Sequence, residues 1–203
     1  MFDRMALALS KPLVDFGARQ VAKRGISAVQ VTLACFALGM FSALLIAVGH
    51  EGIALIPMLA GRACDGLDGA MARLQNQQTD RGAFLDIALD FLFYAAVPLA
   101  FALAAPAQNA LAGAVLLAAF LGTGTSFLAF ATIAEKRDLK STAYPTKSFY
   151  YLGGLTEGAE TIAIFVAMCL WPAHFAGLAY FFAALCAVTI ATRIVAGWRT
   201  FAP

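Results

Sequence analysis

Long apolar stretches recur along the chain and are separated by short polar connections. Six of them approach the roughly 20 residues that an α-helix needs to cross a bilayer. They cover residues 26–48, 53–74, 91–107, 110–134, 158–171 and 175–191. The segment 91–107 continues an earlier, partly polar stretch, and charged side chains fall inside 53–74 and 158–171. The pattern predicts an all-α integral membrane protein with six transmembrane helices.

The composition supports a membrane protein. Hydrophobic residues make up 62% of the chain and charged residues 13%, whereas soluble domains carry about 25% charged residues. The mean hydropathy is +0.80. Most of the surface is therefore expected to face lipid, and the length favours one membrane domain, residues 26–203, over two soluble domains.

The basic residues alternate between connections. They precede the first segment, follow the second, follow the fourth and follow the sixth: Arg4, Lys11, Arg19, Lys23 and Arg24; Arg73 and Arg81; Lys136, Arg137, Lys140 and Lys147; Arg193 and Arg199. The other connections, near His50 and at 106–109 and 172–174, contain no Lys or Arg. By the positive-inside rule both termini are expected in the cytoplasm. Arg62 alone lies well inside a predicted span.

The N-terminal segment, residues 1–25, alternates apolar and charged positions at helical spacing over residues 3–22. Charged residues such as Asp3, Lys11 and Asp15 interrupt the apolar run, which is unlike a cleaved signal peptide. The spacing predicts an amphipathic helix on the cytoplasmic membrane surface. A solvated extension is the alternative.

Two kinds of site are disfavoured by the composition. The four cysteines, Cys35, Cys64, Cys169 and Cys186, stand singly and are expected to be buried small hydrophobes, because no CxxC or Cys/His spacing is present. The net charge of +2 is small and evenly spread, which argues against a nucleic-acid partner.

Four aspartates cluster between the second and third segments. Asp65 and Asp68 are three residues apart and Asp86 and Asp90 are four apart, so each pair shares one helical face. Helices joined by a short turn are usually antiparallel neighbours. The two aspartate faces are therefore expected to point at each other.

Carboxylates gathered within a membrane protein need compensation by protons or metal ions. Oxygen-only ligands favour Mg²⁺ or Mn²⁺, and a cluster with room for two ions suits phosphoryl chemistry on a diphosphate. Gly69 and Gly82, which extend the two faces, allow a nucleotide to approach the helix backbone closely. A single aspartate is equally well explained as a helix-end residue in the interface, but four at these spacings are not.

These residues resemble a family signature. The pattern D-x2-D-G-x2-A-R-x8-G-x3-D-x3-D of the CDP-alcohol phosphotransferases is matched at every position and gap, by Asp65, Asp68, Gly69, Ala72, Arg73, Gly82, Asp86 and Asp90. The resemblance implies a phospholipid-synthesis enzyme of the bacterial inner membrane. Its site would face the cytoplasm, and the protein would be a homodimer.

The resemblance also implies individual roles. Asp65, Asp68 and Asp86 would be metal ligands, and Asp90 would both face the metals and deprotonate the acceptor hydroxyl. CDP would be bound by Asp68, Gly69, Ala72, Arg73 and Gly82, with Arg73 on the diphosphate. The spacing alone does not choose between Asp86 and Asp90 as the base.

A segment ahead of the aspartates departs from the family. Many members carry proline-asparagine-x-x-threonine at the start of the first span, whereas this chain has Ala28 and Val29 before Thr32. Whether this segment contacts nucleotide is left open, and Thr32 is expected to hydrogen-bond its own helix backbone.

The second half of the chain, at 147–161, resembles a phosphatidylglycerophosphate-synthase-like branch of the family. Lys147 and Arg193 are candidates for binding a phosphate on the acceptor. The alternatives are a topology-setting lysine for Lys147 and snorkelling to the headgroups for Arg193. Glu157 and Glu160 are candidates for capping a helix or for pairing with these cations, and the choice between the two roles is left open.

The favoured function is transfer of a phosphatidyl group from CDP-diacylglycerol to an alcohol, with release of CMP. Glycerol 3-phosphate, inositol, inositol phosphate, serine and a lipid headgroup all remain as acceptors. Three alternatives are kept: transfer of a CDP-linked headgroup to diacylglycerol, a cation or proton transporter that uses the buried aspartates, and a scaffold with a decayed site. Against a transporter, the chain shows no internal repeat.

Overall fold

The computed structural model describes residues 14, 16–74, 79–139 and 154–202. Within these ranges the chain forms α-helices, one short 3₁₀ helix and no strand, which confirms the all-α prediction. The elements are α2 (Ala28–Ala47), α3 (Glu51–Leu74), α4 (Asp80–Ala104), α5 (Pro106–Lys136), α6 (Gly158–Leu170), η1 (Pro172–His174) and α7 (Phe175–Thr200). Residues 16–22 are also helical.

Each of the six predicted segments corresponds to a helix, but only some of these helices have the length and composition of a membrane span. In the described part of the chain four qualify: α2, α4, α5 and the segment of η1 with α7. Helix α3 carries charged residues along its length, including Glu51, Arg62 and Arg73. Helix α6 has 13 residues, which gives a length of about 20 Å against a hydrocarbon core of about 30 Å.

The helix ends differ from the predicted boundaries where local capping decides them. Ser27 and Gln30 form a capping box at the start of α2. The predicted connection 106–109 is shorter in the structure, because Pro106 begins α5 directly after Ala105 and proline is well tolerated in the first helical turn. Buried Asn109 then donates its side-chain N–H to the carbonyl of Phe101 at 3.1 Å, which satisfies the end of α4.

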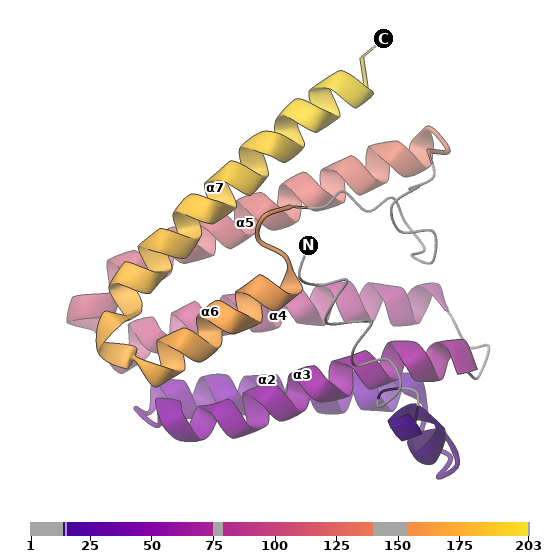
Figure 1. The fold of residues 1–203 in the computed structure, drawn as a ribbon, viewed down its shortest axis with the longest axis horizontal. Helices are drawn as coiled ribbons and strands as arrows, with labels where there is room; N and C mark the ends of the chain where they lie inside the picture. Colours follow the sequence, from indigo (N-terminus) through magenta and orange to yellow (C-terminus); the bar gives the residue numbers. More distant parts are fainter. Residues whose placement is uncertain (1–13, 15, 75–78, 140–153, 203) are drawn as a thin grey trace.

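The helices pack in a layered bundle (Figure 1). Helix α2 lies against α3 and α4, α5 lies against α4 and α7, and α6 contacts α3 and α7. The start of α2, the end of α3, the start of α4 and the ends of α5 and α7 all lie at one end of the bundle (Figure 1). These are the ends next to the basic residues of the sequence, so the fold gathers the positive charge on one side.

The N-terminal segment approaches α2 and α3 in its described part. Ala18 is fully buried, in a cluster with Val31, Cys35, Ala70 and Met71. Arg19, next to it in sequence, is exposed. One side of residues 16–22 is therefore covered by α2 and α3, and the amphipathic helix on the membrane surface stays a prediction. Residues 1–13 and 15 of that prediction lie outside the described residues.

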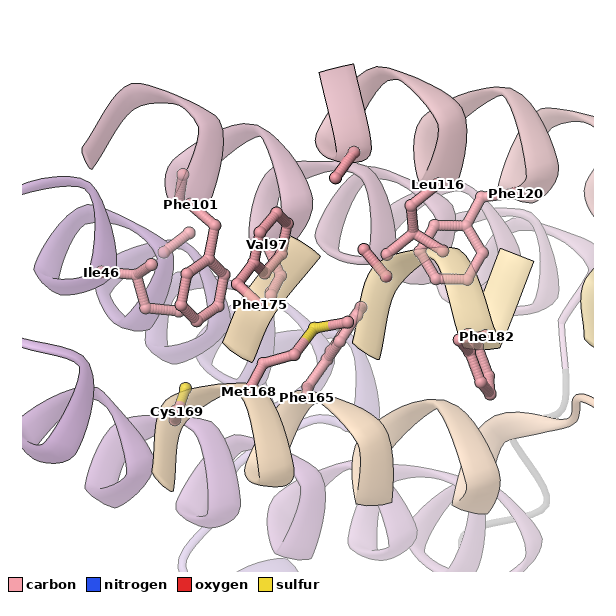
Figure 2. Close-up of a cluster of buried hydrophobic side chains, with 14 of the residues drawn as sticks. Ile46, Val97, Phe101, Leu116, Phe120, Phe165, Met168, Cys169, Phe175 and Phe182 are labelled. Carbon is pink, nitrogen blue, oxygen red and sulfur yellow. The ribbon is translucent and has the colours of Figure 1, made fainter. Parts of the chain in front are cut away.

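A cluster of aromatic side chains forms the core between α4, α5, α6 and α7 (Figure 2). Phe165 of α6 is fully buried and packs edge-to-face on Phe93 and Phe120, with ring centroids 6.0 and 5.9 Å apart. Phe101 stacks on Phe175 at 4.5 Å. Because lipid tails are as apolar as these side chains, close van der Waals packing rather than exclusion of water holds such helices together.

Large apolar side chains also cover the outside of the bundle. Exposed examples occur on α2, α3, α4, α5 and α7: Phe41, Ile56, Leu103, Leu111 and Ile194. An apolar exterior of this extent is expected of a protein that faces lipid rather than water.

Phe165→Ala is expected to destabilise the bundle by about 3–5 kcal/mol, the range for removing a buried aromatic ring. The substitution would leave a cavity against Phe93 and Phe120. Thermal unfolding of the purified protein in detergent measures the effect. Phe181→Ala is the matched control, since Phe181 of α7 is 58% exposed; equal losses of stability in the two variants would contradict the assignment of the core.

Candidate metal and nucleotide site

Helices α3 and α4 bring the aspartates together. Carboxylate oxygens of Asp65, Asp68 and Asp86 lie within 4.8 Å of one another. Asp65 and Asp68 come from the last three turns of α3, and Asp86 comes from the first two turns of α4. The two aspartate faces thus meet as the spacing predicts. The turn between them, residues 75–78, lies outside the described residues.

Asp68 is the most enclosed member of this triad. It is 7% exposed, and its carboxylate accepts hydrogen bonds from the Thr32 hydroxyl at 2.5 Å and from the Gly69 backbone N–H at 2.6 Å. The Thr32 hydroxyl also lies 3.1 Å from the carbonyl of Ala28. The predicted bond to its own helix is therefore present, but a hydroxyl has one proton to donate, so the two acceptors are alternatives. Sequence reasoning missed the link to Asp68, which spans 36 positions.

Asp90 faces Arg62, a residue to which the sequence assigned no role. Arg62 Nη1 lies 2.7 Å from Asp90 Oδ1 and 3.5 Å from Asp65 Oδ2. The guanidinium also lies over the Phe93 ring, 4.8 Å from its centroid. Two signals in the sequence point to Arg62: it is a cation inside an apolar span, and it stands three residues before Asp65, on the same helical face.

A small cleft opens where these groups converge. It is lined by Thr32, Phe36, Arg62, Asp65, Asp86, Leu89 and Asp90. Its volume is about 10 Å³, which is the space of about one water-sized sphere. A cleft of this volume can take an ion but is too small for a nucleotide, which would have to bind outside it.

The residues present fit a hard divalent cation. The triad supplies oxygen ligands only, which is the donor set that Mg²⁺ and Mn²⁺ prefer. Three carboxylates this close repel one another unless a cation or protons compensate them. The triad of Asp65, Asp68 and Asp86 is therefore the group that would hold the ion.

The two signature glycines differ from the glycines that pack helices together. A Cβ at Gly113 would lie 3.0 Å from the carbonyl oxygen of Pro98 on the neighbouring helix. Among the described residues, a Cβ at Gly69 would meet Arg73 Nη1 at 3.5 Å and a Cβ at Gly82 would meet the Thr79 hydroxyl at 3.4 Å, each from its own helix end. Within the described part of the chain, no neighbouring helix approaches either glycine in the way that α4 approaches Gly113.

Gly69→Ala is expected to weaken binding of the CDP donor, raising its KM about tenfold, without loss of thermal stability. A methyl group would stand where the nucleotide approaches, while alanine is the better helix former. Gly113→Ala should do the opposite, lowering stability by about 1–3 kcal/mol through overpacking against α4. Donor titrations and thermal unfolding of both variants test the pair; a Gly69→Ala protein with an unchanged donor KM would contradict the assignment.

The remaining signature residues lie at the same end of α3. Ala72 is half-buried and Arg73 is exposed, one helical turn beyond Gly69. Gly82 lies in the first turn of α4, where its backbone N–H donates to the Thr79 hydroxyl at 3.1 Å. The residues predicted to bind CDP thus lie within one or two helical turns of the aspartates along α3 and α4, and their role stays a prediction.

The structure describes one of the two residues predicted to bind an acceptor phosphate. Lys147 lies outside the described residues. Arg193 is buried: Nη1 donates to the carbonyl of Thr123 at 3.0 Å, and the guanidinium lies over the Phe127 ring at 5.5 Å. This burial disfavours the snorkelling alternative. Glu157 and Glu160 form a capping box at the start of α6, which is one of the two roles that the sequence left open for them.

The segment before α6 is hydrogen-bonded to α7 one turn from Arg193. The Thr189 hydroxyl accepts from the backbone N–H groups of Leu155 and Thr156, both at 3.2 Å. Gly154 is so close to α7 that a Cβ there would lie 3.1 Å from Arg193 Nη2. Glu157, which follows Thr156, and Arg193, which lies one turn after Thr189, are both buried.

Comparison with known proteins gives three findings. The sequence pattern of a family described as CDP-alcohol phosphatidyltransferase matches residues 26–197. Inner membrane protein YnjF of Escherichia coli (strain K12) is 52% identical over 200 residues, covering 98% of this chain and 97% of that protein. Among solved structures, Mycobacterium tuberculosis phosphatidylinositol phosphate synthase (PgsA1) with CDP-DAG bound has a TM-score of 0.74 at 20% identity, covering 92% of this chain and 94% of that chain.

The same mycobacterial protein in complex with manganese and citrate gives a TM-score of 0.73 at 21% identity, covering 91% of this chain and 88% of that chain. At these identities the structural matches establish a shared fold.

Proposed function

The chain belongs to the CDP-alcohol phosphatidyltransferase family, and from this premise we propose that it transfers a phosphatidyl group from a CDP-diacylglycerol-type lipid to an alcohol, releasing CMP. The observation that carries the proposal is the meeting of the aspartate faces of α3 and α4 beside glycines that contact no neighbouring helix among the described residues. A fold relative solved with CDP-DAG bound supports the choice of donor.

The proposed setting is the bacterial inner membrane, with six spans, both termini in the cytoplasm and the site facing the cytoplasm. Helices α3 and α6 would complete the six, although neither meets the criteria of a span by itself. Two observations support this placement: the helix ends near basic residues gather at one end of the bundle (Figure 1), and the relative of known location is named an inner membrane protein. Asp65, Asp68 and Asp86 lie toward that same end.

Asp65, Asp68 and Asp86 would hold Mg²⁺ or Mn²⁺, and a second ion would involve Asp90. A structure of the fold relative contains manganese. When bound, such ions supply positive charge to the donor diphosphate and to the oxygen of the leaving group.

The donor would lie with its acyl chains in the bilayer and its diphosphate at the cytoplasmic end of α3. Arg73, exposed at that end, would bind the diphosphate through charge-assisted hydrogen bonds. Gly69 and Gly82 would let the nucleotide reach the helix backbone, with Asp68 and Ala72 beside it. These residues fix the orientation of the phosphorus relative to Asp90, and positioning accounts for much of the rate of phosphoryl transfer.

Asp90 would act as the base. In the structure its Oδ1 accepts a hydrogen bond from Arg62 Nη1, and in the reaction its carboxylate would accept the proton of the acceptor hydroxyl. The acceptor oxygen then forms a bond to the lipid-side phosphorus, and the bond from that phosphorus to the bridging oxygen breaks. CMP leaves with the bridging oxygen, and the proton passes from Asp90 to water.

The acceptor would approach from the side of α7. Arg193 supplies a buried cation there, and Lys147, which lies outside the described residues, is kept as a second candidate from the sequence. A cation at this place favours a phosphorylated acceptor such as glycerol 3-phosphate over inositol or serine. The enzyme is also proposed to be a homodimer, which light scattering corrected for detergent would test.

CMP release by the purified protein in lipid tests the proposal, using CDP-diacylglycerol, Mg²⁺ or Mn²⁺ and a panel of acceptor alcohols. Release that depends on an acceptor and is abolished by a chelator is expected. A second arm supplies CDP-linked headgroups with diacylglycerol, and release only in that arm would reverse the roles of donor and acceptor. No release in either arm, from folded protein, would overturn the proposal.

A further inference from the structure

From the placement of Arg62 we infer that this residue is a built-in cation of the acidic site, which competes with a second divalent ion for Asp90. The two metal positions would then have unequal affinities. The position at Asp65, Asp68 and Asp86 would bind an ion tightly, and the position at Asp90 would bind an ion only when Arg62 releases the Asp90 carboxylate. The inference deepens the proposed function and rests on its metal site.

Arg62 lies between the aspartates of α3 and the aspartates of α4. Its guanidinium belongs to α3, yet its shortest contact, at 2.7 Å, is to Asp90 on α4, 28 positions away. The contact to Asp65 on its own helix is longer, at 3.5 Å. The side chain of Arg62 is 15% exposed and that of Asp90 is 30% exposed, so the ion pair is largely shielded from water.

The Phe93 ring packs against the Arg62 guanidinium. Phe93 lies one turn after Asp90 and is 1% exposed, and Arg62 lies 4.8 Å from its centroid. Arginine keeps its charge in proteins and stacks well on aromatic faces. The positive charge of Arg62 is therefore permanent, and the Phe93 ring packs against the group that carries it.

The charges of the four carboxylates are compensated unequally. Arg62 contributes one positive charge, which lies 2.7 Å from Asp90 and 3.5 Å from Asp65 and is thus shared between them. The triad of Asp65, Asp68 and Asp86 keeps an excess of negative charge, so a first divalent ion is attracted there. A second ion would have to replace a charge-assisted hydrogen bond, which is among the stronger kinds in proteins, and would meet the repulsion of the guanidinium.

A purely structural role for Arg62 makes a different prediction. If Arg62 only tied α3 to α4, its removal would loosen the aspartates and weaken both metal positions together. If it competes with metal, its removal strengthens the weak position. The direction of the change in the weaker affinity therefore separates the two roles.

Manganese binding to the full-length protein in detergent, without substrate, tests the inference. Free Mn²⁺ is followed by its electron paramagnetic resonance signal during titration. The wild type is expected to bind one Mn²⁺ tightly and a second weakly.

In Arg62→Gln the dissociation constant of the weakly bound ion should fall about tenfold or more, and that of the tightly bound ion should change much less. Arg62→Lys, which keeps the charge, should stay close to the wild type. Without metal, Arg62→Gln should unfold at a lower temperature, because Asp90 has lost its cation.

Two further results would decide the matter if Arg62→Gln fails to fold. Asp90→Asn should keep the tight ion and lose the weak one; loss of both ions, or two equal ions in the wild type, would overturn the inference. An unchanged or weakened second affinity in folded Arg62→Gln would overturn it as well. Because no substrate is present, a protein that releases no CMP but shows the unequal ions contradicts the proposed function and leaves this inference standing.

Discussion

Asp90→Asn should reduce CMP release by about 10²- to 10⁴-fold, the usual contribution of a positioned general base. The asparagine side chain has nearly the same shape but does not take the hydroxyl proton. Initial rates of CMP release at saturating donor, acceptor and metal measure the loss. The effect should fall on kcat, because the donor diphosphate is held by other residues.

Asp80→Asn is the matched control for this prediction. Asp80 stands in the first turn of α4 but is exposed and outside the aspartate cluster, so this variant should keep wild-type rates. Thermal unfolding of both variants guards against a general loss of structure. A folded Asp90→Asn protein with near wild-type kcat would remove Asp90 from the role of base and leave Asp86 as the candidate.

Asp86→Asn is expected to abolish the tight binding of Mn²⁺ and to lower CMP release about 10³-fold. Asp86 is the only member of the triad that comes from α4, so its loss opens the site between the two helices. Metal-assisted charge stabilisation contributes several kcal/mol in such reactions, and each 1.36 kcal/mol is about tenfold in rate.

Two measurements check this second prediction. In the wild type, saturating Mn²⁺ should raise the unfolding temperature, since an ion present at about 100 times its dissociation constant stabilises the folded state by about 2.7 kcal/mol. Asp86→Asn should lose this rise. Asp138→Asn is the control: Asp138 is exposed and has a φ of 52°, a conformation that asparagine also adopts readily. A rise that persists in Asp86→Asn would contradict the proposed metal site.

Several features of the protein follow from local sequence patterns. The apolar segments predict the helices, because a chain in lipid must satisfy its backbone hydrogen bonds internally. The spacing of Asp65 and Asp68, and of Asp86 and Asp90, places each pair on one face of its helix without reference to the rest of the fold. The free cysteines were also predicted, and three of them, Cys35, Cys169 and Cys186, are buried.

Other features depend on which helices become neighbours. The bounds of α6, Gly158–Leu170, match the predicted segment 158–171, but the attachment of the preceding residues to α7 does not follow from periodicity: the Thr189 hydroxyl accepts hydrogen bonds from the backbone N–H groups of Leu155 and Thr156. The burial of Arg193 likewise requires α5, whose Thr123 carbonyl accepts its hydrogen bond. A sequence shows a cation near the end of a span but not whether a neighbouring helix covers it.

The candidate site also combines features that local sequence patterns specify with features that depend on contacts between helices. The sequence by itself determined which carboxylates and glycines form the candidate site, because their spacing is local to α3 and α4. Only the tertiary structure decided how those charges are balanced: Thr32 reaches Asp68 across 36 positions and Arg62 reaches Asp90 across 28. Such contacts form because α2, α3 and α4 pack side by side, and helical periodicity specifies the face of each helix but not the partner that it meets.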